Sequence, residues 1–205
     1  CPVEKIERVR ILFLPQRSDL GAASRVRLYE YLSFLDGKNI HYRVISGTTS
    51  RLDRKMSTRP TVFIKICWFL SLFLNRLRAI FYAPFFDVIF LQKETMPYLF
   101  PLIDLLLITV SRRSVFDFDD AIFNYGKTKG FLKKMFFDKR NIARIIERCD
   151  RIIVSNAYLL EYAKQFHHDV RMIPTSILRS AYDGIIHRNS KGAKPVIGWI
   201  GSEST

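Results

Sequence analysis

Cysteine, glycine and proline are all scarce in this sequence of 205 residues. The three cysteines, Cys1, Cys67 and Cys149, lie far apart and form neither a disulfide framework nor a CxxC metal site. Nine glycines and eight prolines exclude collagen-like and proline-rich low-complexity architectures. We therefore expect a folded protein from a reducing, cytoplasmic compartment.

Acidic residues are also in short supply. The sequence has 33 basic and 19 acidic residues, which gives a net charge of +14. Such an excess indicates a polyanionic partner, either nucleic acid, a phosphorylated ligand or an anionic membrane face. Because 48% of the residues are hydrophobic and only 25% are charged, wholesale disorder is excluded. The length suffices for one ordinary domain and a little more.

The sequence has no long uninterrupted hydrophobic run. The most hydrophobic segment, 62–86, contains three basic residues, and its longest uncharged stretch, 66–75, is 10 residues long. A membrane-spanning helix needs about 20 apolar residues, so we expect none. Two interpretations stay open for this segment. One is a buried or half-buried helix, favoured by its hydrophobicity all round; the other is an interfacial helix on anionic lipid, with Trp68 in the headgroup region.

Short apolar runs alternate with helix-length segments along the chain. This alternation predicts βαβ units and hence an α/β fold, a Rossmann-like parallel sheet flanked by helices. Strands are predicted at 8–14, 40–46, 87–91, 114–118, 151–155, 169–173 and 195–200. Helices are predicted at 21–37, 62–86, 97–110 and 157–166, with a polar loop at 47–58.

The pattern also predicts a domain boundary. The first domain covers 1–174, a polar linker covers 175–194, and 195–205 reads as the first strand and loop of a second domain. Since the sequence begins with Cys1 and stops just after a predicted strand, we expect a fragment of a longer protein.

Gly21 follows the first predicted strand at the start of a helix. In an open parallel sheet, ligands bind beyond the carboxyl ends of the strands. A glycine there lets backbone N–H groups approach an anion, and the helix dipole favours negative charge. Arg25 and Arg27 can add charge-assisted bonds to phosphate or carboxylate. The alternative is an ordinary turn followed by two solvated arginines.

Asp119 and Asp120 follow the predicted strand 114–118. A carboxylate at this position can accept a proton from an attacking hydroxyl or orient a sugar hydroxyl. Asp117, two residues earlier, can point to the same face as Asp119. The alternative is that Asp120 caps a helix beginning at Ala121.

Two further loops carry candidate binding residues. Lys93 and Glu94 follow the third strand, where they either bind substrate or form a solvent-facing pair of little energetic weight. Gly201 and Ser202 offer backbone donors and a hydroxyl to a phosphate. Two adjacent histidines near residue 167 have no ligand-forming neighbours, so we predict no metal site.

The region 127–151 is strongly basic, with nine Lys or Arg residues against three acidic ones. Nucleic-acid binding suits this charge, but no DNA- or RNA-binding motif accompanies it. A solvated helix face is the default interpretation, and a surface for anionic lipid or a phosphorylated acceptor is the alternative. We expect no nucleic-acid partner.

Six motifs fall in a family order that spans nearly the whole chain. They are GAASRVRLYEYL, DVIFLQKE, VFDFDDAIF, CDRIIVSNAYLLEYA, VRMIPTSI and GWIGSEST. Together they resemble the retaining glycosyltransferases of the GT-B fold, family four, which use nucleotide-sugar donors. The chain resembles the N-terminal, acceptor-side domain of these enzymes, with the linker and the first strand of the C-terminal domain.

The resemblance implies sugar transfer with retention from a nucleotide-diphosphate sugar to a hydroxyl of a polysaccharide or a lipid-linked acceptor, with neither cofactor nor obligatory metal. It implies catalytic roles for Asp119 and Asp120. The donor phosphates or nucleotide would lie near Gly21, Arg25, Gly201 and Ser202, and the acceptor near Lys93, Glu94 and Asn156.

The donor-binding half of that family lies outside these 205 residues, so we expect the fragment alone to be inactive. The basic face and the aromatic-rich segment suit work in the cytoplasm, at the inner face of the cell membrane. The alternative is a non-catalytic Rossmann-like module that binds a phosphorylated or nucleotide ligand.

Overall fold

A computed structural model describes residues 9–38, 40–96, 101–127, 140–177 and 183, with only the backbone described at 125–127. Within these residues, six parallel strands form one sheet in the order β2-β1-β3-β4-β5-β6. The predicted Rossmann-like α/β fold is therefore confirmed. The predicted strand 195–200, nearly all of the linker 175–194 and much of the basic region 127–151 lie outside the described residues.

The strands match the predicted ones to within two residues at either end. They are β1 (Val9–Pro15), β2 (Ile40–Val44), β3 (Val88–Gln92), β4 (Ser114–Phe118), β5 (Arg151–Val154) and β6 (Val170–Met172). The helical elements are α1 (Ala22–Ser24), η1 (Arg25–Tyr29), α2 (Glu30–Leu35), α3 (Ser50–Thr58), α4 (Val62–Tyr82), η2 (Ala83–Phe85), α5 (Leu102–Val110), η3 (Ile122–Lys127), α7 (Asn141–Arg148) and α8 (Ala157–Lys164).

The order of the strands reverses between β1 and β3. The chain first places β2 on one side of β1, then crosses to the other side and adds β3 to β6 in sequence. Phe13 of β1 is thus paired with Val44 of β2 on one side and with Phe90 of β3 on the other. In sheets of this kind the loops diverge at the reversal and leave a crevice at the carboxyl ends of the two strands.

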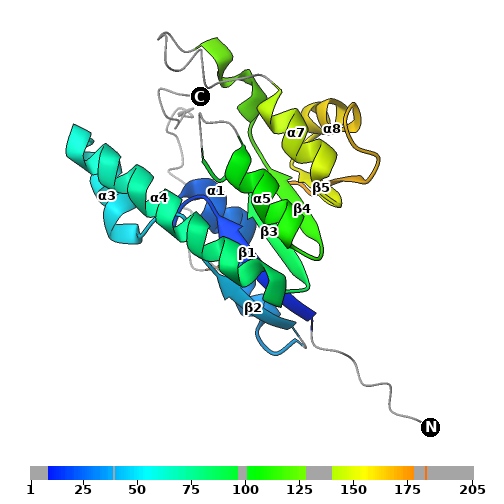
Figure 1. Ribbon diagram of the computed structural model, residues 1–205, viewed down its shortest axis with the longest axis horizontal. Coiled ribbons are helices and arrows are strands. Elements are labelled where there is room, and N and C mark those ends of the chain that lie inside the picture. The colour runs from blue at the N-terminus through cyan, green and yellow to red at the C-terminus, as the bar shows by residue number, and fades with distance from the viewer. Residues whose placement is uncertain (1–8, 39, 97–100, 128–139, 178–182, 184–205) are drawn as a thin grey trace, which may run out of the picture.

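Helices cover the two faces of the sheet unequally. The helices α4, α5 and α7 lie side by side on one face, whereas the helical segment 22–35 lies on the other (Figure 1). Right-handed crossovers require this arrangement, because the connection from β1 to β2 runs across the sheet in the opposite direction from the later ones.

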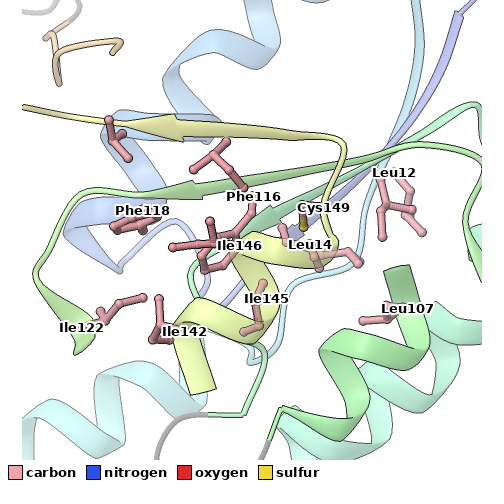
Figure 2. Close-up of a cluster of buried hydrophobic side chains, with 14 of the residues drawn as sticks. Leu12, Leu14, Leu107, Phe116, Phe118, Ile122, Ile142, Ile145, Ile146 and Cys149 are labelled. Carbon is pink, nitrogen blue, oxygen red and sulfur yellow. The ribbon is translucent and has the colours of Figure 1, made fainter. Parts of the chain in front are cut away.

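The main core lies between the sheet and the helices of the larger layer. Figure 2 shows Phe116 and Phe118 of β4 facing the apolar side of α7. Ile142, Ile145 and Ile146 supply that side at the i, i+3, i+4 spacing of an amphipathic helix. Each such buried side chain contributes about 1.5–3 kcal/mol to stability, so this layer anchors the carboxyl end of β4 firmly.

The prediction of a loop at 47–58 is wrong, because α3 occupies most of this segment. Thr49 caps this helix, its side chain accepting a hydrogen bond from the backbone of Leu52. The segment has an almost wholly polar sequence, and the residue that it buries is Asp53 rather than an apolar one. Its two apolar residues, Leu52 and Met56, pack against the cluster of Trp68, Leu72 and Met96, but two apolar residues in so polar a sequence are a weak helix signal, which is why the pattern suggested a loop.

Asp53 joins three segments through four hydrogen bonds. Its carboxylate accepts from the backbone N–H of Ser18 at 2.9 Å, the Ser18 hydroxyl at 2.6 Å and the Thr48 hydroxyl at 2.7 Å. The indole N–H of Trp68 donates to it at 3.0 Å. The loops that follow β1 and β2 are thereby held to α4.

The helix predicted at 62–86 is confirmed as α4 with the short η2 turn after it. Its buried side consists of Trp68, Leu72, Arg76 and Ala79, and the other side is open to solvent, so the helix is half-buried rather than enclosed. No helix within the described part of the chain has both the length and the hydropathy that a membrane crossing requires.

Candidate functional site

Three loops meet at the carboxyl edge of the sheet, after β1, β3 and β4. The side-chain amide of Gln16, after β1, donates to the carbonyl of Glu94, after β3, at 2.9 Å. Lys93 reaches in the other direction, to the two aspartates that follow β4. The structure thus brings together Lys93, Asp119 and Asp120, which the sequence placed on separate loops.

Lys93 forms the centre of this cluster. Its ammonium lies 3.1 Å from Asp119 Oδ1 and also donates to Asp120 Oδ2. Its backbone has a φ of 61°, and it is the non-glycine residue with positive φ among those described. Because this conformation is uncommon for side-chain-bearing residues and occurs often at functional sites, it supports a functional reading of the loop.

The three side chains differ in their access to solvent. Lys93 and Asp119 are largely buried, at 13% and 16% exposed, whereas Asp120 is 53% exposed. Burial lowers the pKa of Lys93, but the charges of Asp119 and Asp120 outweigh it and the net shift is upward. Lys93 is therefore a fixed cation, and Asp120 is the carboxylate that an incoming molecule can reach.

Arg27 and Asp117 form a second, deeper ion pair. Arg27 Nε donates to Asp117 Oδ2 at 2.9 Å, and both side chains are almost fully enclosed. Burial raises the pKa of Asp117, although Arg27 opposes the shift. Another nitrogen of Arg27 donates to the carbonyl of Ile173 at 2.9 Å, so this arginine also holds the chain where it leaves β6.

Arg27 comes from η1, a π-helical turn. Such turns shift side chains around the helix axis and are frequent at functional sites. Arg25, the arginine that we assigned to the donor phosphates, instead lies on the surface, 54% exposed, with Glu30 3.6 Å away. Of the two arginines, Arg27 is thus the enclosed one and Arg25 the one open to solvent.

Gly21 allows a close approach within the loop after β1. A Cβ atom at this position would lie 2.7 Å from Cβ of Arg17, so a larger residue would push the loop apart. The Gly21 N–H donates to the carbonyl of Ser18 at 2.9 Å. In this conformation the turn itself uses the donor that the sequence offered to a phosphate.

Glu94 lies beneath the loop rather than at its surface. Burial raises its pKa to about 7, with Asp104 adding to the shift. Asp104 is also buried, accepts from the backbone N–H of Thr95 at 2.8 Å, and has its pKa raised to about 6 by burial. Lys93 forms its ion pairs with the aspartates after β4, so the solvent-facing pair considered for Lys93 and Glu94 does not form.

We expect Glu94→Gln to change how stability depends on pH. Because the pKa of Glu94 rises from 4.5 to about 7 on folding, the unfolded chain loses this proton first. The wild-type free energy of unfolding then falls as the pH rises through that interval. Glutamine has no proton to lose, so relative to wild type the variant gains on the order of 3 kcal/mol between pH 5 and pH 8. Urea unfolding of both proteins at the two pH values measures this. The same difference in free energy of unfolding between variant and wild type at both pH values would contradict the prediction.

Asn156 follows Ser155, a residue that contacts the loop of Asp119. Its side chain caps α8 by accepting from the backbone of Leu159 at 3.0 Å. The neighbouring hydroxyl of Ser155 donates to the carbonyl of Asp119 at 3.1 Å. Asn156 therefore stabilises the start of α8 in this structure. Its expected role in acceptor binding stays a prediction. Gly201 and Ser202 lie outside the described residues.

A buried polar pair between β3 and α1 was not predicted from the sequence. The hydroxyl of Ser24 donates to the side-chain oxygen of Gln92 at 2.9 Å, and both residues are buried. A glutamine ending an otherwise apolar buried strand was the available signal, because parallel strands of this kind are usually apolar throughout.

Within the described ranges, no group of three His, Cys, Asp or Glu residues is arranged to hold a metal ion. The two carboxylates that follow β4, Asp119 and Asp120, both form ion pairs with Lys93. No protein-family model and no curated protein matches this chain. The resemblance to glycosyltransferases therefore stays a prediction from the motifs.

Proposed function

We propose that this chain is the acceptor-side domain of a GT-B glycosyltransferase. In this proposal the complete protein moves a sugar from a nucleotide-sugar donor to a hydroxyl of a polysaccharide or lipid-linked acceptor. The observation that carries the proposal is the cluster of Lys93, Asp119 and Asp120 beside the β1–β3 crevice.

The cluster suits recognition of hydroxyl groups. A carboxylate accepts hydrogen bonds from sugar hydroxyls, and one within reach can take the proton of the attacking hydroxyl. Asp120 is exposed enough for this contact, and its ion pair with Lys93 holds the carboxylate in place at the mouth of the loop. Asp119, which is more buried, positions Lys93 from the other side.

The proposed reaction exchanges one bond at the anomeric carbon for another. The acceptor oxygen bonds to that carbon, the bond to the donor diphosphate breaks, and the hydroxyl proton leaves to an oxygen such as that of Asp120. The departing diphosphate needs positive charge, which arginine, lysine and helix N-termini supply in such sites. Gly21 and Arg25 remain proposed for this role, together with Gly201 and Ser202.

We also propose where the complete protein acts. Nucleotide sugars and lipid-linked acceptors would meet at the cytoplasmic face of a membrane. The net charge of +14 is consistent with a site beside anionic lipid.

A transfer assay tests the proposal on the longest native polypeptide that contains this chain. Radiolabelled UDP-, GDP- and ADP-sugars are incubated with the protein and with membrane lipid or polysaccharide, and label in the acceptor fraction is counted. We expect acceptor-dependent transfer from one donor class. If the chain alone binds nucleoside diphosphates tightly and the complete protein transfers nothing, the chain is a binding module instead.

A further inference from the structure

The helix α4 has a continuous apolar stripe on its outer side. With about 3.6 residues per turn, these side chains fall within an arc of roughly 120°. They extend along about 29 Å of the helix at 1.5 Å per residue. The stripe consists of Val62, Phe63, Ile66, Leu70, Phe73, Leu74 and Phe81, each between 40% and 76% exposed.

The stripe continues beyond α4 itself. Phe85 of η2 and Leu102 of α5, a helix that packs against α4, are each 66% exposed. A groove of about 480 Å³ runs between Ile66, Phe73 and Met96. Met96 follows the loop that holds Lys93 and Glu94, so this apolar surface reaches to within a few residues of the candidate site.

The segment that carries most of this surface is basic. The segment 54–86 contains six basic residues and no acidic one. Arg76 is buried among backbone carbonyls, and the other five are exposed at the surface. They are Arg54, Lys55, Arg59, Lys65 and Arg78. An apolar stripe with a basic border complements a surface that is apolar beneath a layer of negative charge.

We infer that α4 docks on an anionic lipid bilayer, lying in the plane of the interface. In this position the stripe, here called the α4 stripe, enters the boundary between headgroups and acyl chains, and the basic residues meet lipid phosphates. This inference extends the proposed function by naming the surface on which the acceptor is met, but its physical basis does not depend on sugar transfer.

A second copy of the chain fits this face less well. A symmetric dimer would bring the same patch of each copy together, so the basic border of one would meet the basic border of the other. Like charges opposed in this way cost affinity, whereas an anionic bilayer neutralises them. Insertion across the bilayer is also a poor fit, because the buried guanidinium of Arg76 ties α4 to the sheet.

Co-sedimentation with two types of lipid vesicle tests the inference. The mixed vesicles contain phosphatidylglycerol and phosphatidylcholine, and the neutral vesicles contain phosphatidylcholine alone. We expect the protein to pellet with the mixed vesicles and at least about tenfold more weakly with the neutral ones, with added salt weakening the former. The variant Phe63→Ser/Leu70→Ser should lose at least about tenfold in binding to the mixed vesicles, because two apolar contacts disappear.

Phe34→Ser is the matched control, since Phe34 is 66% exposed on α2, on the other face of the sheet. It should bind like wild type, and circular dichroism checks that both variants are folded. Lys65→Glu should weaken binding to mixed vesicles only. Absent binding by wild type, equal binding to both vesicle types, or equal losses in the control would overturn the inference.

Sedimentation velocity without lipid separates the dimer from the membrane. If the α4 stripe joins two copies, wild type sediments as a dimer, the Phe63→Ser/Leu70→Ser variant sediments as a monomer, and neither binds vesicles. That result would overturn the inference while leaving the proposed sugar transfer untouched. Conversely, vesicle binding without any transfer would overturn only the proposed function.

Discussion

Replacing Asp120 by asparagine should lower the rate of sugar transfer by the complete protein by about 10²–10⁴-fold, as expected for loss of a general base. The substitution preserves size and removes only the charge. Because the Asp120 side chain is 53% exposed, the fold should not suffer. The initial rate of nucleoside diphosphate release at saturating donor measures the effect.

Asp119→Asn should also lower the rate, by a smaller factor, because Asp119 acts through Lys93 rather than on the substrate in our proposal. Asp36→Asn is the matched control, since Asp36 is exposed and its partner is the Tyr42 hydroxyl at 2.7 Å. Normal turnover in both Asp119→Asn and Asp120→Asn would refute the assigned roles.

Replacing Arg76 by methionine should reduce the free energy of unfolding by about 3–5 kcal/mol. The guanidinium is fully buried and donates to the carbonyl of Ile45 at 2.9 Å and to those of Leu14 and Pro15. Burial lowers its pKa to about 10, so it is charged at neutral pH. Methionine fills much of the volume but removes the guanidinium from all three carbonyls, of which that of Pro15 keeps the backbone N–H of Gly47 as a donor at 3.0 Å.

Guanidinium chloride unfolding followed by circular dichroism measures this loss. Arg78→Met is the matched control, two residues further along the same helix and exposed, and we expect it to cost less than about 1 kcal/mol. Equal costs for the two variants would mean that the carbonyls find other donors when Arg76 is removed.

The fold was largely predictable because its strands are short apolar runs bounded by polar turns. The boundaries of β4 were predicted to the residue, since Ser114 to Phe118 is flanked by arginines and aspartates. The helix α3 was not predictable, because its inward residue is Asp53, whose partners come from three other segments. Patterns of hydrophobicity report burial of apolar side chains and are silent on buried carboxylates.

The sequence indicated the residues of the candidate site but did not indicate which of them contact one another. Lys93, Asp119 and Asp120 were each found from their place after a strand, but their contact depends on β3 and β4 being neighbours. Spacing alone did not predict that Arg25 is exposed whereas Arg27 is enclosed beside Asp117. This difference depends on the π-helical turn η1, which changes where each side chain points and has no signature in the sequence.

The inner side of α4 has a consequence for the orientation of the whole molecule. A helix held only by apolar packing can roll about its axis, because such contacts have no preferred direction. Here Trp68 donates to Asp53 at 3.0 Å, and Asn75 donates to the carbonyl of Gly47 at 3.1 Å. These directional bonds prevent α4 from rotating about its axis. They therefore also fix the angle between the domain and any surface that the outer side of α4 touches.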